Sequence, residues 1–234
     1  MSLSTTSLQK SYGASRALNG VSISAVSGRV HGLVGANGAG KSTLVKVLSG
    51  AIRPDGGSVT IGGWTGSALT PRLAQHLGVA TIYQDPGLAP TLGIAENILL
   101  GREHARFGTI LATGSQMSDV KDCLDHVGLK KPLRTPAGAL SPADQQLLEI
   151  AKAVYRRAGT VIMDEPTAAL GDADRHRLFE VVQRMRAAGV AIIYVSHHLQ
   201  EVIDLCDDVT VMRGGEVVLH TSTNATVVDD LVTA

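Results

Sequence analysis

The stretch from Gly35 to Ser42 combines the residue types that can hold a chain of phosphates. Its members are Gly35, Ala36, Asn37, Gly38, Ala39, Gly40, Lys41 and Ser42, which fit the spacing G-x-x-x-x-G-K-[ST] at every fixed position. Glycines allow successive backbone N–H groups to turn toward a phosphate, and a following helix points its positive dipole end at the same place. Lys41 would bridge the β- and γ-phosphates of a nucleotide, and the Ser42 hydroxyl would ligate Mg²⁺.

Two adjacent carboxylates could complete a metal and hydrolysis site. Asp164 and Glu165 follow the apolar stretch Thr160–Met163, which predicts a buried strand. Because ligands collect at the carboxyl ends of parallel strands, this strand would bring both acids next to the phosphate loop. We expect Asp164 to hold Mg²⁺, directly or through water, and Glu165 to orient and polarise an attacking water as general base.

Two further polar residues also follow predicted strands. His197 comes after Val190–Val195 and could donate a hydrogen bond to a γ-phosphate, whose presence it would then sense. Gln84 comes after Val79–Tyr83, and its amide could contact the attacking water or Mg²⁺. A lone histidine or glutamine at such a place is more often an ordinary surface residue, so both assignments depend on the phosphate loop and the acidic pair.

The elements that must position these residues alternate between strand and helix. Val30–Val34 predicts an apolar strand before the phosphate loop, and the helix after the loop is expected to end at Gly50. Strand-like segments flank Tyr12, and Val209–Met212 and Glu216–Leu219 predict a hairpin. This alternation predicts an α/β fold with a mostly parallel sheet.

Residues 85–157 differ in character and predict a helical subdomain inserted into the α/β core. Ser118 is expected to cap a helix that Gly128 ends. Apolar residues recur at helical spacing in two segments: Val120, Cys123, Leu124 and Val127, then Leu147, Ile150, Ala151 and Val154. We therefore expect one domain, 1–234, with its core at about 1–84 and 158–234 and its helical subdomain at about 85–157.

Composition limits the class of protein. The chain has 234 residues with 21 Lys+Arg and 21 Asp+Glu, and this zero net charge argues against a protein that holds nucleic acid mainly by phosphate neutralisation. Its two cysteines, Cys123 and Cys206, form no metal-binding pattern, which excludes a disulfide scaffold and favours a reducing cytosol. No apolar run approaches the ~18 residues of a membrane span, and we expect no signal peptide at the start.

The order of these motifs resembles the ATP-binding cassette (ABC) ATPases over nearly the whole chain, from Tyr12 to about Gly215. The phosphate loop, Gln84, a signature region, Val161–Thr167 and His197 follow one another as they do in that family. Within the family, the chain is most similar to the ATPases of bacterial carbohydrate importers of the ribose, xylose and galactose type. The segments that carry this likeness are Ala95–Glu103, Gln145–Ala153 and Ile192–His197.

The resemblance implies a P-loop NTPase core with an N-terminal antiparallel β subdomain. It also implies that Tyr12 stacks on adenine, that Thr43 joins the phosphate loop in binding ATP, and that His197 is the switch histidine. The catalytic set would be Lys41, Gln84, Glu165 and His197, and the metal set Ser42, Gln84 and Asp164.

The resemblance further implies an ATPase, peripheral on the inner face of the cell membrane, that energises an importer whose cargo is expected to be a sugar. Two cassettes, identical or different, would enclose two ATP molecules, with Ser141 of one signature facing the γ-phosphate bound by the other. Closure and reopening would drive alternating access in transmembrane permease subunits, which receive the sugar from a binding protein. Gln84 and the segment after it, including Arg106 and Phe107, would contact those subunits.

The signature itself departs from the family pattern L-S-G-G-Q, because it reads Leu140-Ser141-Pro142-Ala143-Asp144. Ser141 can cap the helix, Pro142 suits the first helical position, and Asp144 completes a capping-box pattern. Ala143 adds a Cβ where close approach is wanted, and the Asp144 carboxylate, at ~5 Å and a dielectric constant of ~20, would repel each unit of phosphate charge by on the order of 3 kcal/mol. We expect weak closure and an asymmetric dimer with a better partner; the alternative is that Asp144 turns away and the site works normally.

Two other functions stay open. A regulatory cassette that binds ATP but hydrolyses it weakly is supported by the altered signature and opposed by the intact Lys41, Asp164 and His197. An ABC ATPase outside transport, acting on ribosomes or DNA, would favour basic patches or long insertions, which the sequence lacks. A P-loop kinase would not need Gln84, the signature region and His197 in this order.

The nearest relatives commonly carry two cassettes in one longer chain, so this chain is either a single-cassette protein or half of a tandem one. The sequence does not specify the sugar.

Overall fold

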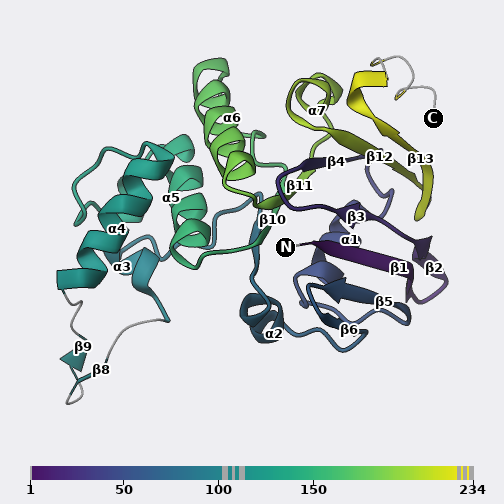
Figure 1. Ribbon diagram of the computed structural model, residues 1–234, viewed down its shortest axis with the longest axis horizontal. Helices are drawn as coiled ribbons and strands as arrows, with labels where there is room; N and C mark the ends of the chain where they lie inside the picture. The colour runs from purple at the N-terminus through teal and green to yellow at the C-terminus, as the bar shows by residue number, and fades with distance from the viewer. Residues whose placement is uncertain are drawn as a thin grey trace. The chain divides into compact units, whose positions relative to one another are not determined.

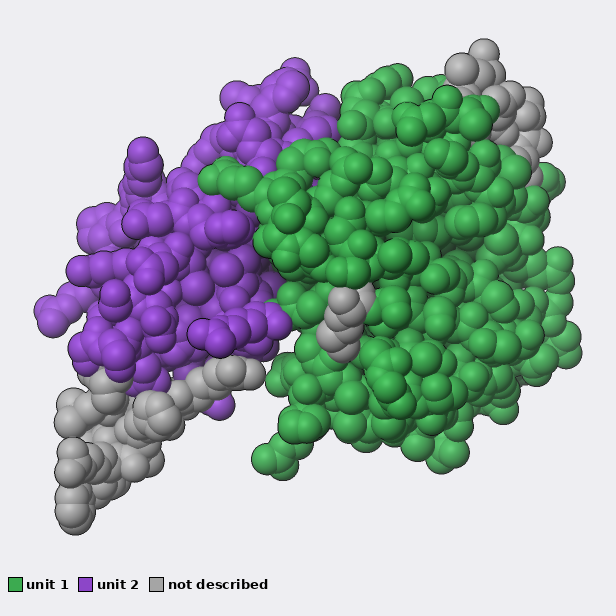
Figure 2. Space-filling view, viewed as in Figure 1, with its two compact units in different colours: residues 1–84, 158–166, 183–234 green, residues 85–157, 167–182 purple. Residues whose placement is uncertain are grey.

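The computed structural model describes residues 2–101, 105–106, 109–110, 114–225, 228 and 231, with the backbone alone at 105–106 and 109–110 (Figure 1). The side chains of Arg106 and Phe107, predicted to contact a membrane partner, lie outside the described residues. The chain divides into two compact units (Figure 2): the first comprises Met1–Gln84, Ala158–Pro166 and Gln183–Ala234, and the second comprises Asp85–Arg157 and Thr167–Val182.

Residues 167–182 group with the helical unit, whereas the sequence placed them in the core. Within the second unit, Nη2 of Arg177 lies 3.6 Å from the Asp144 carboxylate. The helix α6 (Asp172–Ala187) begins in the second unit and ends in the first.

The N-terminal strands of the first unit form an antiparallel sheet. They are β1 (Leu3–Tyr12), β2 (Ser15–Val21), β3 (Ser24–Ala25), β5 (Gly56–Ile61) and β6 (Trp64–Gly66). The strand order is β2-β1-β5-β6, and β3 pairs with β1. This sheet confirms the antiparallel β subdomain that the resemblance implied.

A six-stranded sheet forms the other half of the first unit. Its strands are β4 (Val30–Val34), β7 (Val79–Ile82), β10 (Thr160–Asp164), β11 (Ala191–Val195), β12 (Asp208–Arg213) and β13 (Glu216–Ser222), in the order β13-β12-β4-β11-β10-β7. All neighbours are parallel except β12 and β13, which form the predicted hairpin. Every residue of β4 and β11 is buried, and β11 reads as a continuous apolar run, as buried parallel strands do. The mostly parallel sheet of an α/β fold is thus confirmed.

Among the described residues, the first unit wholly contains the helices α1 (Lys41–Leu48), α2 (Pro71–His76) and α7 (Leu199–Leu205) and the 3-10 turn η2 (Thr223–Ala225). Leu44 and Leu48 of α1 are buried in one core with Leu18 of the antiparallel sheet and Ile162 of the parallel sheet. Helix α1 therefore joins the two sheets through a shared apolar core, and Gly50 follows its end at φ 74° as predicted.

The second unit is mainly helical. Its elements are α3 (Ile94–Leu99), β8 (Ala105–Arg106), β9 (Thr109–Ile110), α4 (Gly114–Val127), η1 (Ala137–Ala139), α5 (Pro142–Tyr155) and the first part of α6 (Asp172–Ala187). Helices α3, α4 and α5 pack against one another (Figure 1). In the part of the chain that the structure describes, no helix is both long enough and apolar enough to cross a membrane.

The predicted start of α4 was wrong, because the helix begins at Gly114 and contains Ser118 inside it. The buried face of α4 extends one turn further toward the N-terminus than the apolar pattern indicated, since Gln116 is buried four residues before Val120. A polar residue at that buried position hid this turn from the periodicity.

A buried histidine lies in β4, directly before the phosphate loop. The Thr210 hydroxyl of β12 lies 3.0 Å from Nε2 of His31 and 3.1 Å from Nδ1 of His220. Among the described residues, Nδ1 of His31 has no hydrogen-bond partner. Burial, then the charges of His220 and Arg29, lower the pKa of His31 from 6.5 to about 4. The folded protein therefore holds His31 neutral.

This histidine should destabilise the fold as the pH falls. The unfolded chain protonates His31 below pH 6.5, whereas the folded chain resists protonation down to about pH 4. Between these values the unfolded state binds more protons, so about 3 kcal/mol of the free energy of unfolding should be lost. Urea unfolding at pH 7, 5.5 and 4 should show a flatter pH dependence for His31→Gln than for wild type. The exposed control His76→Gln should keep the wild-type slope, and equal slopes for all three proteins would contradict the assignment.

Candidate functional site

The phosphate loop connects β4 to α1 in a conformation that only glycine accommodates at several positions. Gly35, Gly38 and Gly40 adopt φ angles of 152°, 82° and 102°. A Cβ on Gly35 would lie 2.2 Å from the Met212 carbonyl oxygen, and one on Gly40 would lie 2.3 Å from the Ala17 carbonyl oxygen. Close backbone packing behind the loop therefore fixes two of its glycines, in addition to the positive φ angles.

The ammonium group of Lys41 lies inside this loop. Its Nζ donates hydrogen bonds to the carbonyl oxygens of Gly35, at 2.5 Å, and Ala36, at 3.2 Å. Burial lowers the pKa of Lys41, although the charges of Glu165 and Asp164 oppose that effect. Because a buried cation bonded to neutral carbonyls gains from an anionic ligand, the loop is suited to a phosphate.

The acidic pair stands at the carboxyl end of β10, as predicted. Burial raises the pKa of Asp164, and the adjacent charge of Glu165 raises it further, while Lys41 partly opposes both. Glu165 has a left-handed φ of 49°, and its N–H donates to the Val195 carbonyl oxygen of β11 at 3.0 Å. A non-glycine residue held in this region stores about 1 kcal/mol or more of strain, which is common at functional sites.

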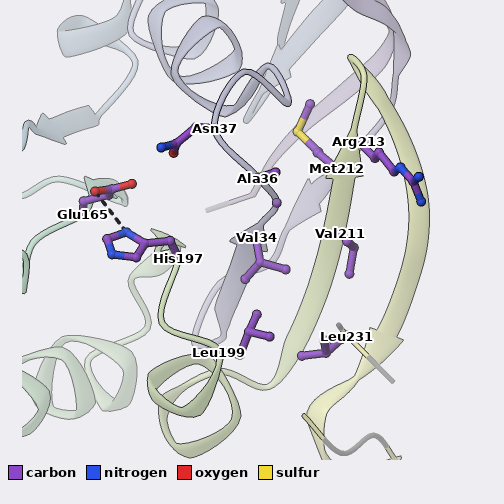
Figure 3. A pocket seen from close by; sticks show the side chains of 11 residues that line it. Val34, Ala36, Asn37, Glu165, His197, Leu199, Val211, Met212, Arg213 and Leu231 are labelled. Atoms are coloured by element: carbon purple, nitrogen blue, oxygen red, sulfur yellow. Dashed lines mark ion pairs between the residues drawn. The ribbon is translucent and has the colours of Figure 1, made fainter. Parts of the chain in front are cut away.

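His197 reaches the acidic pair from the end of β11. Its Nδ1 lies 3.2 Å from Oε2 of Glu165, and the two side chains are 47% and 20% exposed (Figure 3). The structure therefore brings together the two residues predicted to sense the γ-phosphate and to activate water.

A cavity of about 700 Å³ opens beside these groups (Figure 3). It is lined by Val34, Gly35, Ala36, Asn37, Glu165, His197, Leu199, Val211, Met212, Arg213 and Leu231. The polar groups Glu165, His197 and Asn37 lie on one side of it, and the apolar side chains lie toward β4 and β12.

The wall made by β12 was missed by the sequence analysis. Val211, Met212 and Arg213 were read only as part of a hairpin, but β12 also pairs in parallel with β4. The carboxyl end of β12 therefore reaches the same sheet edge as the phosphate loop. The helix α7 between β11 and β12 indicates that β12 runs parallel to β11 in the same sheet, but it does not indicate that β12 lies next to β4.

A comparison with known families decides the class of this site. A protein family described as "ABC transporter" matches residues 18–168, which is more than half of the chain. The chain belongs to the ABC transporter family. The matched segment of this ABC chain contains the phosphate loop, Gln84, the signature region and the acidic pair.

Solved structures agree with this family. A nucleotide-free ATP-binding cassette from an ABC transporter is 26% identical to the ABC chain, with a TM-score of 0.88 over 100% of this chain and 96% of the other. A cassette of an ABC transporter in its ADP conformation is 28% identical, with a TM-score of 0.85 over 95% and 91% of the two chains.

Curated relatives share more sequence but are longer. The "Ribose import ATP-binding protein RbsA 1" of Rubrobacter xylanophilus is 44% identical over 89% of the ABC chain and 42% of its own length. The "Ribose import ATP-binding protein RbsA" of Cereibacter sphaeroides is 40% identical over 99% of this chain and 46% of its own length. The ABC chain thus spans less than half the length of these relatives.

Other residues predicted for the site lie outside the lining of the cavity. Tyr12, at the end of β1, is 50% exposed, with the Lys10 ammonium 5.7 Å from its ring centroid. Gln84 is exposed after β7, while Ser42 is exposed and Thr43 half-buried in the first turn of α1. An exposed tyrosine ring remains available for stacking on a base, so its predicted role stays a prediction.

The altered signature lies in the second unit of the ABC chain, at the start of α5. Ser141 caps this helix, and its hydroxyl accepts a hydrogen bond from the Asp144 N–H at 3.2 Å. The Asp144 carboxylate is buried and lies 3.4 Å from Lys131 Nζ and 3.6 Å from Arg177 Nη2. Ala143 is buried as well. The sequence suggested that the Asp144 carboxylate carries an uncompensated charge. The structure shows instead that two cations compensate it.

Removing this compensated carboxylate should destabilise the second unit. Asp144→Ala should lower the free energy of unfolding by about 1–3 kcal/mol, because it leaves two cations without their buried partner, although both remain half-exposed. The control Asp174→Ala breaks an exposed pair with the same Arg177 and should cost less than about 1 kcal/mol. Urea unfolding would measure both, and equal losses would show that the burial of Asp144 carries no special weight.

Proposed function

We propose that the ABC chain binds ATP with Mg²⁺ and hydrolyses it to energise a sugar importer. The observation that carries this proposal is the contact between His197 and Glu165, 3.2 Å apart, beside a loop that already holds the Lys41 ammonium. This arrangement supplies a cation for the phosphates and a carboxylate for the attacking water in one place.

Several side chains of the ABC chain have distinct roles in ATP hydrolysis. Lys41 and the backbone N–H groups of the loop hold the β- and γ-phosphates, and they stabilise charge that develops on the phosphate oxygens. Glu165 accepts a hydrogen bond from water and orients it toward the γ-phosphorus as general base. His197 donates to the γ-phosphate and keeps the Glu165 carboxylate in place through their contact. Tyr12 supplies a surface for the adenine ring.

The donor set fits Mg²⁺. Asp164 carries a pKa raised by burial and by Glu165, so two crowded carboxylates gain from a nearby divalent cation. Mg²⁺ prefers oxygen ligands and usually keeps several water and phosphate oxygens in its shell, so it needs only a few protein groups. Asp164, Ser42 and Gln84 would hold the ion, which neutralises phosphate charge when bound.

The proposed partners are a second cassette, transmembrane permease subunits and, through them, a sugar-binding protein, at the cytoplasmic face of the membrane. The names of the curated relatives, which are ribose import proteins, support a sugar as the cargo. Since those relatives are more than twice as long as the matched segment, the second cassette is either a separate chain or part of the same protein. The same names do not favour a weakly hydrolysing regulatory cassette.

Reconstitution tests this proposal. The chain would be assembled in liposomes with candidate permease and sugar-binding proteins, and ATP hydrolysis would be measured with ribose, xylose, galactose or no sugar. We expect at least one sugar to accelerate hydrolysis and to accumulate in the lumen. A hydrolysis rate that none of the sugars changes would contradict the assignment as a sugar importer. A wild-type rate equal to that of Glu165→Gln with and without each sugar would favour the regulatory cassette.

A further inference from the structure

The turn that carries His197 is held by a buried carboxylate. Glu201, in the first turn of α7, is 4% exposed. Its Oε2 accepts hydrogen bonds from the Tyr194 hydroxyl, at 3.0 Å, and from the Ser196 hydroxyl, at 3.3 Å. Tyr194 lies in β11, Ser196 follows the strand directly, and both are themselves buried. One carboxylate oxygen therefore binds two hydroxyls of the segment that leads to His197.

The residues on both sides of His197 belong to this network. The Ser196 hydroxyl also accepts a hydrogen bond from the His198 N–H at 3.0 Å, and the Ser196 N–H donates to the Leu33 carbonyl oxygen of β4 at 3.3 Å. The peptide of His197 is thus fixed before and after its Cα. From this position its ring points toward Glu165, and both side chains line the cavity (Figure 3).

Burying the Glu201 carboxylate costs desolvation free energy. An apolar side chain could pack between α7 and β11 without the desolvation cost of a buried acid. What the acid adds is direction, because hydrogen bonds to a single oxygen fix the positions of the Tyr194 and Ser196 hydroxyls. Catalytic groups must be held within a fraction of an ångström to act on a bound substrate.

We propose that Glu201 is a positioning residue for ATP hydrolysis, which acts through Tyr194 and Ser196 to fix the turn from which His197 reaches Glu165 and the γ-phosphate. The inference rests on the proposed function, in which His197 and Glu165 touch the substrate. Glu201 itself acts only through its neighbours.

The first test reads the position of His197 without any hydrolysis. Imidazole signals of the isotope-labelled chain would be recorded by NMR and assigned with His197→Gln. Glu201→Gln and Ser196→Ala should shift or broaden the His197 signals, while the control Asp204→Asn, an exposed acid on the same helix, should leave them unchanged. Unchanged His197 signals in both network variants would overturn the proposal. If Glu201→Gln does not fold, the smaller change Ser196→Ala decides.

The second test separates positioning from a merely structural role. Glu201→Gln should lower kcat by about 10- to 100-fold with little change in KM for ATP, because binding groups stay in place while His197 moves. In a His197→Ala background the same change should cause little further loss of kcat. An equal loss in both backgrounds would overturn the proposal. If the wild-type chain hydrolyses no ATP, the proposed function fails, and the NMR result still decides whether Glu201 positions His197.

Discussion

Glu165→Gln should lower kcat for ATP hydrolysis by at least about 100-fold, which is the size of effect expected when a general base is removed. The amide keeps the shape of the side chain and its left-handed backbone, but it cannot take a proton from water. Because Glu165 is only 20% exposed and faces His197, bulk solvent cannot easily supply another base at this place. Steady-state kinetics with Mg-ATP would measure the change.

ATP binding should survive this substitution, because the phosphate loop and Lys41 do not depend on the carboxylate. Glu216→Gln, which alters an exposed carboxylate in β13 of the same unit, serves as the matched control and should hydrolyse ATP at the wild-type rate. Near-normal hydrolysis by Glu165→Gln would mean that another group activates water, and the assigned roles of the acidic pair would have to be withdrawn.

Gly40→Ala should destabilise the fold far more than Gly38→Ala. Both residues have positive φ angles, 102° and 82°, so alanine at either position costs about 1–2 kcal/mol of backbone strain. At Gly40 the new Cβ would also lie 2.3 Å from the Ala17 carbonyl oxygen, whereas at Gly38 nothing lies within 4 Å. A backbone atom in β2 cannot move away cheaply, so the clash adds about 1–3 kcal/mol.

Urea unfolding of the two variants would test this difference. We expect a total loss of about 2–5 kcal/mol in the free energy of unfolding for Gly40→Ala and about 1–2 kcal/mol for Gly38→Ala. Equal losses would show that the loop relaxes away from β2, and the packing account of Gly40 would be wrong.

The sequence predicts much of the frame because local chemistry decides it. The glycine spacing between Gly35 and Lys41 allows few conformations, and the buried parallel strands β4, β10 and β11 are mostly apolar in sequence. The sequence alone therefore predicts that the residues at the ends of these strands lie at one sheet edge.

Long-range pairing decides what the sequence could not predict. The cavity wall formed by Val211 and Met212 depends on β12 lying next to β4, which no local pattern specifies. Lys131, 13 positions before Asp144, and Arg177 from another helix compensate the charge of the Asp144 carboxylate. The residues next to Asp144 in sequence do not reveal these partners, so the predicted local charge was too negative. The start of α4 was misplaced because its first buried side chain, Gln116, is polar.

Equilibrium binding of Mg-ATP tests the central claim most directly, and Glu165→Gln is the background that keeps the nucleotide intact. Titration calorimetry should show saturation at submillimolar ATP, about −4 kcal/mol or better in binding free energy. Adding Lys41→Ala should weaken binding at least about tenfold, while Lys46→Ala, an exposed lysine of the same helix, should leave it unchanged. No binding at millimolar Mg-ATP, or equal binding with and without the Lys41 ammonium, would contradict the account.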